Sequence, residues 1–260
     1  MSSKNWLTSF LAPPSPTNLL DLPDFSMQIA AVRDEWRPLV EKWSESEFGK
    51  ELIFEIYRQR FTLRKEIVPK FPLRALTLTD LSETKIVILG DGPSAVGNVA
   101  DGLAFSSGLE RFYCPETWGI IEELRRDLGI EDLKLHNLDH WAARGALLLN
   151  CVLTAEHGHH RAHYDIGWEI LTDQLIGALA KHKSPKVFLL WGRIARSKAL
   201  AIRSIGKQHL VLESSAPTKF ETEKLDTFSG SGHFTKSKEF LLSHGINFDW
   251  GRPEPTETYR

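Results

Sequence analysis

The chain carries few of the features that mark exported or membrane proteins. It has two cysteines, Cys114 and Cys151, without the close spacing of a structural zinc site or a disulfide framework. No apolar run approaches the ~18 residues of a membrane span. No signal peptide is visible at the N-terminus. We therefore expect a cytoplasmic protein that works in a reducing environment and has no membrane partner.

A strong net charge is also missing. The formal net charge is −2, because lysine and arginine nearly balance aspartate and glutamate. This balance gives no global signal for nucleic acid, although a local basic patch is enough to hold phosphates. The 260 residues show no internal repeat, and 42% of them are hydrophobic, which is enough for one large domain. We expect the protein to be a monomer.

Apolar patterning predicts an α/β fold. Strand-like runs alternate with helical patterns, which is typical of βαβ units and a mainly parallel sheet. An earlier helical stretch, 34–60, is interrupted near Gly49. The expected strands are 85–90, 146–152, 186–191 and 209–213, and the expected helices between and after them are 117–128, 167–181, 193–204 and 236–244.

The two ends of the chain differ in composition from its middle. Residues 1–33 include the proline-rich stretch 12–16 and scattered apolar residues, so we expect an N-terminal arm. The last ten positions, 251–260, contain Pro253 and Pro255 and are expected to form a flexible tail. The sequence thus predicts a single domain over 34–250.

The most informative stretch follows the first expected strand. An apolar run ends at Gly90, and a loop of mostly small residues, 91–95, leads on toward Phe105. Continuous apolar runs rich in β-branched residues are typical of strands buried on both faces. In parallel α/β sheets, ligands bind at the carboxyl ends of the strands. The loop after Gly90 is therefore the first candidate for a binding pocket.

Four blocks of the sequence resemble the family 1 uracil-DNA glycosylases. Residues 145–154, GALLLNCVLT, are similar to the family's GVLLLNAVLT, and 167–169, GWE, follow at the family's spacing. Residues 187–192, VFLLWG, look like the next strand and turn, and 233–236, HFTK, resemble the family's HFSK. The resemblance covers most of the expected domain. It implies a three-layer α/β/α sandwich with a central four-stranded parallel sheet, and a DNA N-glycosylase activity.

The resemblance assigns two residues to the base. Enzymes of this kind rotate a nucleotide out of the DNA stack to reach its base. Phe105 matches the phenylalanine that stacks on the base, and a core aromatic is the ordinary alternative. Asn150 matches the asparagine that reads the pyrimidine's Watson–Crick edge. Its amide carries both a donor and an acceptor, so it can address uracil or cytosine. A buried asparagine at a strand end can also merely satisfy backbone groups.

Several family positions differ here. The family loop GQDPYHG is GDGPSAV, so Gly92 replaces the water-activating aspartate and Ser94 the tyrosine that blocks a 5-methyl group. Asp91 stands where the family has glutamine. In the loop that matches the family's HPSPL, the leaving-group histidine is Ala216 and the intercalating leucine is Phe220. The base pocket expected on this basis consists of Gly90, Gly92, Pro93, Ser94, Ala95, Phe105 and Ala216.

These differences leave two interpretations. In one, the chain has lost catalysis and only binds nucleic acid. In the other, Asp91 and Asn150 carry the catalysis, because cleavage through an oxocarbenium-like transition state depends heavily on electrostatics. Other branches of the superfamily also lack an aspartate at this loop position, which favours the active interpretation. The core motif has no lysine for a Schiff base, so a lyase step is not expected.

The small residues at 94 and 95 also bear on the choice of base. Pocket shape and contacts to exocyclic groups set that choice in base-flipping enzymes. An open wall predicts a pyrimidine with a bulky group at C5, such as hydroxymethylated or glucosylated cytosine in phage DNA, and an antiviral role. The alternative is that Val96 or a shifted side chain refills the space, and that uracil remains the substrate in base excision repair.

Loop residues around the pocket are candidates for DNA contacts. Short hydroxyl side chains at loop ends commonly hold phosphates, but they are also ordinary turn and cap formers. Phe220 could act as a wedge that fills the gap left by the flipped base. The DNA-binding set expected from the sequence is Thr117, Ser214, Ser215, Pro217, Thr218 and Phe220.

A histidine-rich stretch, 157–163, has the look of a metal site. Imidazoles do bind zinc, but the segment aligns without gaps to a family loop that carries histidines and binds no metal, and His163 falls where the family has one. We therefore expect no metal and no cofactor. One of these histidines could instead replace the missing leaving-group partner, since imidazole titrates near neutral pH.

Overall fold

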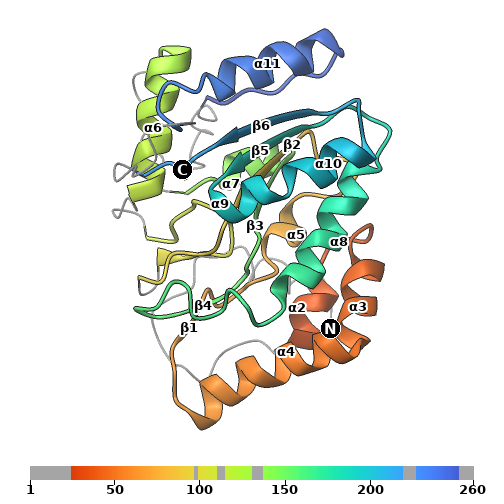
Figure 1. Cartoon of the computed structure of the whole chain (residues 1–260), viewed down its shortest axis with the longest axis vertical. Coiled ribbons are helices and arrows are strands. Elements are labelled where there is room, and N and C mark those ends of the chain that lie inside the picture. The colour runs from red at the N-terminus through yellow and green to blue at the C-terminus, as the bar shows by residue number, and fades with distance from the viewer. Residues whose placement is uncertain (1–24, 97–98, 110–114, 131–136, 219–226, 252–260) are drawn as a thin grey trace, which may run out of the picture.

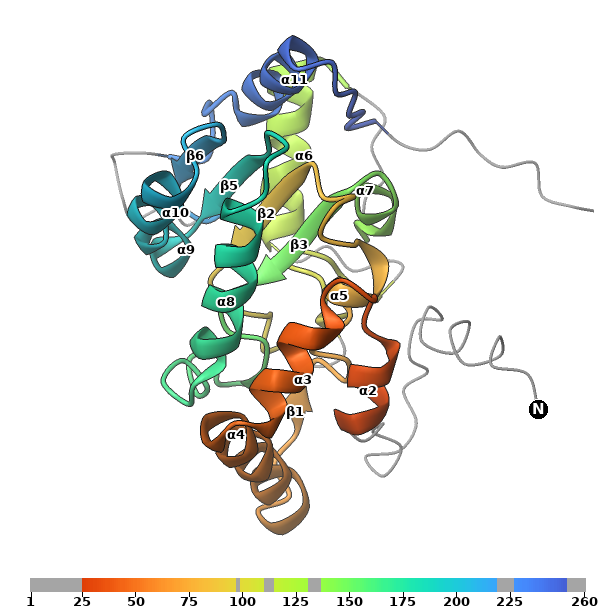
Figure 2. The same cartoon turned by 90° about the vertical axis from the view of Figure 1, so that its right-hand side faces the viewer.

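A four-stranded parallel sheet lies between two layers of helices (Figures 1 and 2). The computed structural model describes residues 25–96, 99–109, 115–130, 137–218 and 227–251. The strand order is β3-β2-β5-β6, and every neighbouring pair is parallel. This confirms the expected α/β/α sandwich. The strands are β2 (Ile86–Gly90), β3 (Ala146–Asn150), β5 (Val187–Trp191) and β6 (Leu210–Ser214).

The burial of the strands explains their composition. Every residue of β2, β3 and β5 is buried. Strands covered by helices on both faces read as continuous apolar runs rather than as alternating patterns. Strand β6 lies at the edge of the sheet, and most of its residues keep partial exposure. The three apolar runs that predicted strands most clearly from the sequence therefore correspond to β2, β3 and β5.

Helices cover the two faces of this sheet. Helix α11 packs on β5, β6 and α6 on one side, and α8 packs with α10 on the other (Figure 2). None of the helices in the described parts of the chain is long and apolar enough to cross a membrane. The helices are α2 (Phe25–Ala31), α3 (Arg37–Glu45), α4 (Glu47–Tyr57), the π-helix η1 (Arg58–Thr62), α5 (Ala75–Leu78), α6 (Pro115–Leu128), α7 (Asp139–Ala143), α8 (Trp168–Ala180), α9 (Arg193–Ser197), α10 (Ala199–Ile205) and α11 (His233–Ser243).

Local capping corrects two of the expected helices. The first helical stretch breaks at Ser46 rather than near Gly49, because the Ser46 hydroxyl accepts a hydrogen bond from the Gly49 N–H and caps α4. The expected helix 193–204 is two helices that meet at Lys198. A two-stranded antiparallel ribbon of β1 (Ile67–Val68) and β4 (Ala155–Glu156), which the sequence did not predict, lies beside the sheet (Figure 1).

Part of the stretch expected as an arm is packed into the core. Helix α2 contacts α3, and Phe25 and Val32 belong to the same buried cluster as the sheet residues. The Phe25 ring meets Tyr57 edge-on, with 6.1 Å between centroids, and lies at the same distance from the Trp168 ring. Residues 1–24 and 252–260 lie outside the described residues. The buried cluster therefore extends from Phe25 to Trp250.

Candidate active site

The carboxyl ends of the four strands stop on one line. Gly90 of β2 is level with Asn150 of β3 on one side and with Trp191 of β5 on the other. Trp191 is in turn level with Ser214 of β6. Because all four strands are parallel, the loops that follow them emerge at the same edge of the sheet. The register therefore brings together residues that are far apart in the sequence.

Gly90, Asn150 and Phe105 meet at this edge. A Cβ atom at Gly90 would lie 2.5 Å from Asn150 Oδ1 and 2.9 Å from Phe105 Cζ, so only glycine allows this approach. Asn150 is 7% exposed, and its buried Oδ1 atom has no hydrogen-bond partner among the residues that the structure describes. An unpaired buried polar atom costs free energy and calls for an explanation such as a missing ligand. The sequence predicted all three residues as members of the site.

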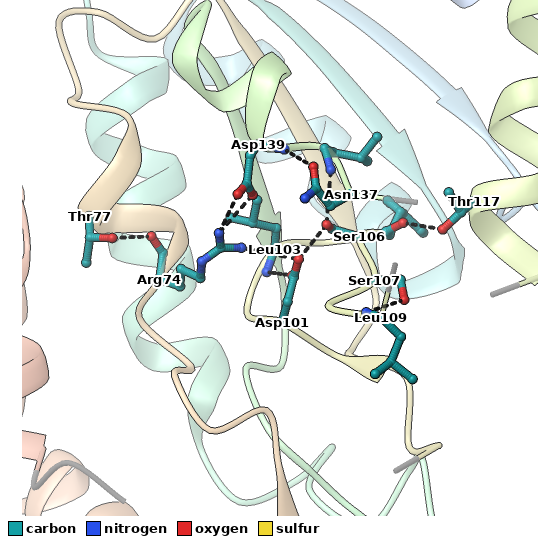
Figure 3. Close-up of polar contacts among 12 residues, drawn as sticks. Arg74, Thr77, Asp101, Leu103, Ser106, Ser107, Leu109, Thr117, Asn137 and Asp139 are labelled. Atoms are coloured by element: carbon teal, nitrogen blue, oxygen red, sulfur yellow. Dashed lines mark hydrogen bonds and ion pairs between the residues drawn. The ribbon is translucent and has the colours of Figure 1, made fainter. Parts of the chain in front are cut away.

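Phe105 is held in an unusual backbone conformation. Its φ angle is +63°, in the left-handed region that favours glycine. The Thr117 hydroxyl donates to the Phe105 carbonyl at 2.7 Å (Figure 3). The neighbouring Ala104 N–H donates to the Leu148 carbonyl of β3. The Phe105 ring lies on Trp191, with 5.5 Å between centroids. Strained residues of this kind persist where the surroundings hold them and cluster at functional sites.

A buried ionic network fastens the loop that carries Phe105. Asp101 accepts hydrogen bonds from the Ser106 hydroxyl at 2.6 Å and from the Leu103 N–H at 2.9 Å. Arg74 lies 3.2 Å from the same carboxylate and also pairs with Asp139 at 2.8 Å (Figure 3). Burial raises the pKa of Asp101, and Arg74 opposes that rise. Nothing in the sequence pointed to this network, because its members are far apart in the chain.

Asp91 is directed at the start of helix α9. Its two carboxylate oxygens accept hydrogen bonds from the backbone N–H groups of Arg193, Ile194 and Ala195, at 3.1, 2.8 and 2.9 Å. Gly192 makes room, since a Cβ atom there would lie 2.5 Å from the carboxylate. Burial raises the pKa of Asp91, and the three N–H groups oppose that rise. The residue expected to carry catalysis thus also acts as the cap of a neighbouring helix.

The loop after Asp91 turns away from the sheet and packs. Pro93 is buried, and Ala95, 8% exposed, packs in a small cluster with Val68 and Ala155. The Ala95 carbonyl accepts a hydrogen bond from the Gly158 N–H, which ties the loop to the histidine-rich segment. Ser94 is partly exposed and Val96 is exposed, so Val96 does not refill the pocket.

Tyr164 is a member of the site that the sequence reasoning missed. A Cβ atom at Gly92 would lie 3.1 Å from Tyr164 Cε1 and 3.5 Å from its hydroxyl oxygen. The tyrosine belongs to the loop before α8 and is partly buried against the main hydrophobic cluster. Its only signal in the sequence is a large aromatic residue in an otherwise polar loop.

In and after the end of β6, most of the side chains predicted to bind DNA are buried or form hydrogen bonds within the protein. Ser214 is fully buried and its hydroxyl donates to the Ser215 carbonyl, while the Ser215 hydroxyl accepts from the Phe228 N–H. Pro217 is buried beneath α6, and the partly exposed Thr218 follows it with its N–H bonded to Ala216. Ala216 is partly exposed.

Three of the expected DNA contacts, Thr117, Ser214 and Pro217, are buried, and one cannot be placed. Thr117 and Ser214 are both 0% exposed with their hydroxyls bonded internally, so they cannot reach a phosphate in this conformation. Thr117 instead holds the Phe105 carbonyl. Phe220, the expected wedge, lies outside the described residues. Ser215 and Thr218 are the expected contacts that keep partial exposure.

His163 is a structural residue of the core. Its Nδ1 atom is 2.8 Å from the Thr154 hydroxyl and its Nε2 atom is 3.0 Å from Gln59 Oε1. Burial lowers the pKa of His163 to about 4. Both ring nitrogens are occupied, so this histidine does not supply a leaving-group partner. In the described residues, no group of three or more His, Cys, Asp or Glu side chains is arranged to hold a metal ion.

Curated proteins provide the decisive comparison. The uracil-DNA glycosylase of Albidiferax ferrireducens is 38% identical over 227 residues, covering 82% of this chain and 90% of the relative. The enzyme of that name from Agrobacterium fabrum is 38% identical over 229 residues, covering 87% and 93%. The chain belongs to the uracil-DNA glycosylase family. This is a family of DNA N-glycosylases, which confirms the resemblance seen in the sequence.

Solved structures agree with this membership of the uracil-DNA glycosylase family. The mimivirus uracil-DNA glycosylase superposes with a TM-score of 0.73 over 95% of each chain, at 20% identity. The uracil-DNA glycosylase structure from Nitratifractor salsuginis gives a TM-score of 0.56 over 86% of this chain and 98% of that one, at 16% identity. At these identities the likeness concerns the fold. No protein-family model matches the sequence.

Proposed function

We propose that this protein is a monofunctional DNA N-glycosylase that flips a pyrimidine nucleotide into the site between Asn150 and Phe105 and hydrolyses its glycosidic bond. The observation that carries the proposal is the buried Asn150 Oδ1 atom, which has no partner in the described residues and lies beside Gly90. A pyrimidine edge offers the donors and acceptors that an amide needs. Phe105 offers a ring on which a flipped base can stack.

The Asn150 amide also supplies a route to catalysis. As the glycosidic bond breaks, positive charge develops on the sugar and negative charge on the departing base. A hydrogen bond from the amide to a base carbonyl strengthens as that negative charge grows, and it does so at a buried position where electrostatic interactions are stronger. Asp91 contributes by fixing the loop after β2 to the start of α9.

Family membership favours uracil as the base. The relatives that match the chain at 38% identity over most of its length are named uracil-DNA glycosylases. The pairing pattern of an asparagine amide suits uracil without further groups. We propose that the protein acts on such DNA as a monomer in the cytoplasm, which accords with its buried free thiol at Cys151.

A pyrimidine with a bulky C5 group is the second candidate, and Ser94 favours it. The resemblance puts Ser94 where the family blocks a 5-methyl group, and its side chain is small and partly exposed. Hydroxymethylated or glucosylated cytosine in phage DNA is the substrate class that this opening would admit. Excision of such bases would serve antiviral defence.

An oligonucleotide panel tests these proposals. Matched duplex and single-stranded oligonucleotides would carry uracil, thymine, 5-hydroxymethylcytosine or its glucoside, and abasic sites would be detected by alkaline cleavage. We expect abasic sites with the wild-type protein and their near-complete loss with Asn150→Ala. Preference for uracil supports repair, and preference for a 5-substituted cytosine supports the second candidate.

A negative panel would point to a binding protein. If the wild type forms no abasic site on any oligonucleotide, the catalytic proposal fails. Fluorescence anisotropy on the same oligonucleotides then measures whether the chain retains DNA binding, which is the outcome expected of an inactive member of the family.

A further inference from the structure

Tyr164 occupies the space that Gly92 leaves at the edge of the sheet. Its ring carbon Cε1 is 3.1 Å from the position of a Cβ atom at Gly92, which is tighter than ordinary van der Waals contact. A Cβ atom at position 92 would therefore require the ring of Tyr164 to shift by a few tenths of an ångström. The loop before α8 thus delivers a large aromatic side chain to the loop after β2.

The surroundings of Tyr164 place it near the carboxyl ends of β2 and β3. Burial raises the pKa of Tyr164 to about 12, and the nearby groups Asp91 and Cys151 add to that rise. Those two residues directly follow the last residues of β2 and β3, Gly90 and Asn150. The ring thus lies against Gly92 and near the segments that follow Gly90 and Asn150.

The position of the ring is set by packing rather than by a polar partner. The Tyr164 hydroxyl makes no hydrogen bond to the described residues, while the side chain packs on the main hydrophobic cluster. Arg161 and Arg193 lie close enough to affect its titration but form no ion pair with any described residue. Near neutral pH the phenol is uncharged, so its contribution to a pocket is its volume.

We propose that the Tyr164 ring is a wall of the base pocket and limits the size of the pyrimidine that can enter. The inference rests on the proposed glycosylase function. The small residues at 92 and 94 open the pocket from one loop, and Tyr164 narrows it again from another. Tyr164 acts as a specificity-determining residue, and it takes no part in bond cleavage.

Truncation of the ring provides the first test. Tyr164→Ala would be compared with the wild type by the ratio of kcat/KM for 5-hydroxymethylcytosine to kcat/KM for uracil. Steric exclusion worth about one or two methylene groups changes such ratios by roughly 10-fold or more. We expect the ratio to rise by that factor. An equal loss of activity on both bases would overturn the proposal, because it would indicate a general structural role.

Three further variants separate volume from other effects. Tyr164→Phe keeps the ring, so its ratio should stay within about twofold of the wild type. Tyr164→Leu keeps apolar packing but is shorter, and it gives the same test if the alanine variant does not fold. Phe61→Ala truncates an aromatic side chain on η1 that is 43% exposed, and it should leave the ratio unchanged. A change in the kcat/KM ratio of Tyr164→Phe, which lacks only the hydroxyl, would overturn the proposal that the size of the ring sets the ratio.

A double-mutant cycle tests the contact itself. Gly92→Ala adds a methyl group against the ring in the wild type but finds open space in Tyr164→Ala. We expect the two substitutions to be non-additive, with the double variant closer to the wild-type ratio than Tyr164→Ala alone. Strictly additive effects would overturn the proposed wall.

The outcomes distinguish the two proposals. If the wild type forms no abasic sites on any oligonucleotide, the proposed function is wrong, and the inference about Tyr164 is wrong as well. If the wild type forms abasic sites but Tyr164→Ala and Tyr164→Leu both keep the wild-type ratio, only the wall is overturned.

Discussion

At the carboxyl edge of the sheet, the β2–β3 side and the β5–β6 side differ in how their polar groups are satisfied. On the β2–β3 side, the buried Asn150 amide oxygen has no partner in the described parts of the chain, and Phe105 is kept in a left-handed conformation. On the β5–β6 side, the polar groups partner one another: Trp191 Nε1 donates to His233 at 3.0 Å, and the Ser214 hydroxyl is bonded to the next residue. Unsatisfied and strained groups that meet at one edge of a sheet call for a functional explanation, whereas the satisfied groups on the β5–β6 side do not.

Differences from the family pattern occur on both sides of the edge. The β2–β3 side keeps Asn150 and Phe105, which the resemblance assigns to the base, and a buried network holds the Phe105 loop, but the loop after β2 differs at Gly92 and Ser94. The other side, where the resemblance expects a leaving-group histidine, has Ala216 and a set of internal hydrogen bonds. We infer that recognition was kept while the contribution of the β6 loop to chemistry was reduced. The following experiments test that contrast, from the largest expected effect to the smallest.

Breaking the network under Phe105 should have the largest effect on stability. Arg74→Met leaves Asp101 buried without its cation, and removal of one partner of a buried pair typically costs about 3–5 kcal/mol. Urea denaturation measures this loss. The matched control is Arg33→Met, which removes an exposed pair with Glu83 and should cost less than about 1 kcal/mol. Equal losses in the two variants would show that the network does not support the loop.

Removing the base reader should affect activity and spare stability. Asn150→Ala is expected to lower kcat/KM about 100-fold, comparable to the loss of one donor in a preorganised site. Its free energy of unfolding should change little, since the Asn150 oxygen has no partner to lose. The control is Asn247→Ala, at an exposed position on the amino-terminal side of the sheet. A loss of stability that matches the loss of activity would make Asn150 a structural residue.

Two helix caps provide the next comparison. Asp91 caps α9, and Asp127 caps α11 by accepting from the Phe234 and Thr235 N–H groups. Asp91→Asn and Asp127→Asn should each cost up to about 1 kcal/mol of stability, because the amide keeps one acceptor oxygen but loses the second one and the charge that interacts with the helix dipole. If Asp91 acts only through its loop, activity falls less than about tenfold. A far larger fall in kcat for Asp91→Asn alone would restore it as a catalytic residue.

The smallest effect near neutral pH comes from two buried histidines. Burial lowers the pKa of both His163 and His233 to about 4, below the ordinary value of 6.5. The unfolded chain takes up these protons below pH 6.5 and the folded chain only near pH 4. The free energy of unfolding should therefore fall as the pH drops through that window. Denaturation midpoints across it test this, and His163→Asn should flatten the profile.

The sequence predicted the sheet well because its signals are local. Buried parallel strands appear as unbroken apolar runs, and their ends coincide with Gly90, Asn150 and Trp191. The parallel arrangement then places those ends at one edge. Phe105 was found through the family resemblance rather than from its own neighbours. Gly90, Asn150, Trp191 and Phe105 could be predicted from the sequence because each is defined by its position in a strand or a motif.

The remaining residues depend on contacts between distant segments. Asp91 looked like a displaced catalytic group, but it faces α9, which begins more than a hundred positions later. Thr117 looked like a phosphate contact, but its hydroxyl reaches back to Phe105. Tyr164 gave only a weak sequence signal and the Arg74 network gave none, because their roles arise only when the loops pack together. Short polar side chains suit caps, turns and phosphate contacts equally well, so sequence alone cannot choose.

Strands that end on one line make the site easy to rebuild one position at a time. Each of the four strands contributes its last residue to the row, and each following loop is a separate segment. A substitution at Gly92, Ser94 or Ala216 therefore leaves the register of the sheet untouched. A deletion within a strand does not have this freedom, because side chains alternate between faces and one lost residue turns the row away. Evolution or engineering of this scaffold can therefore change the chemistry of the loops while the strands keep the positions of the loop ends constant.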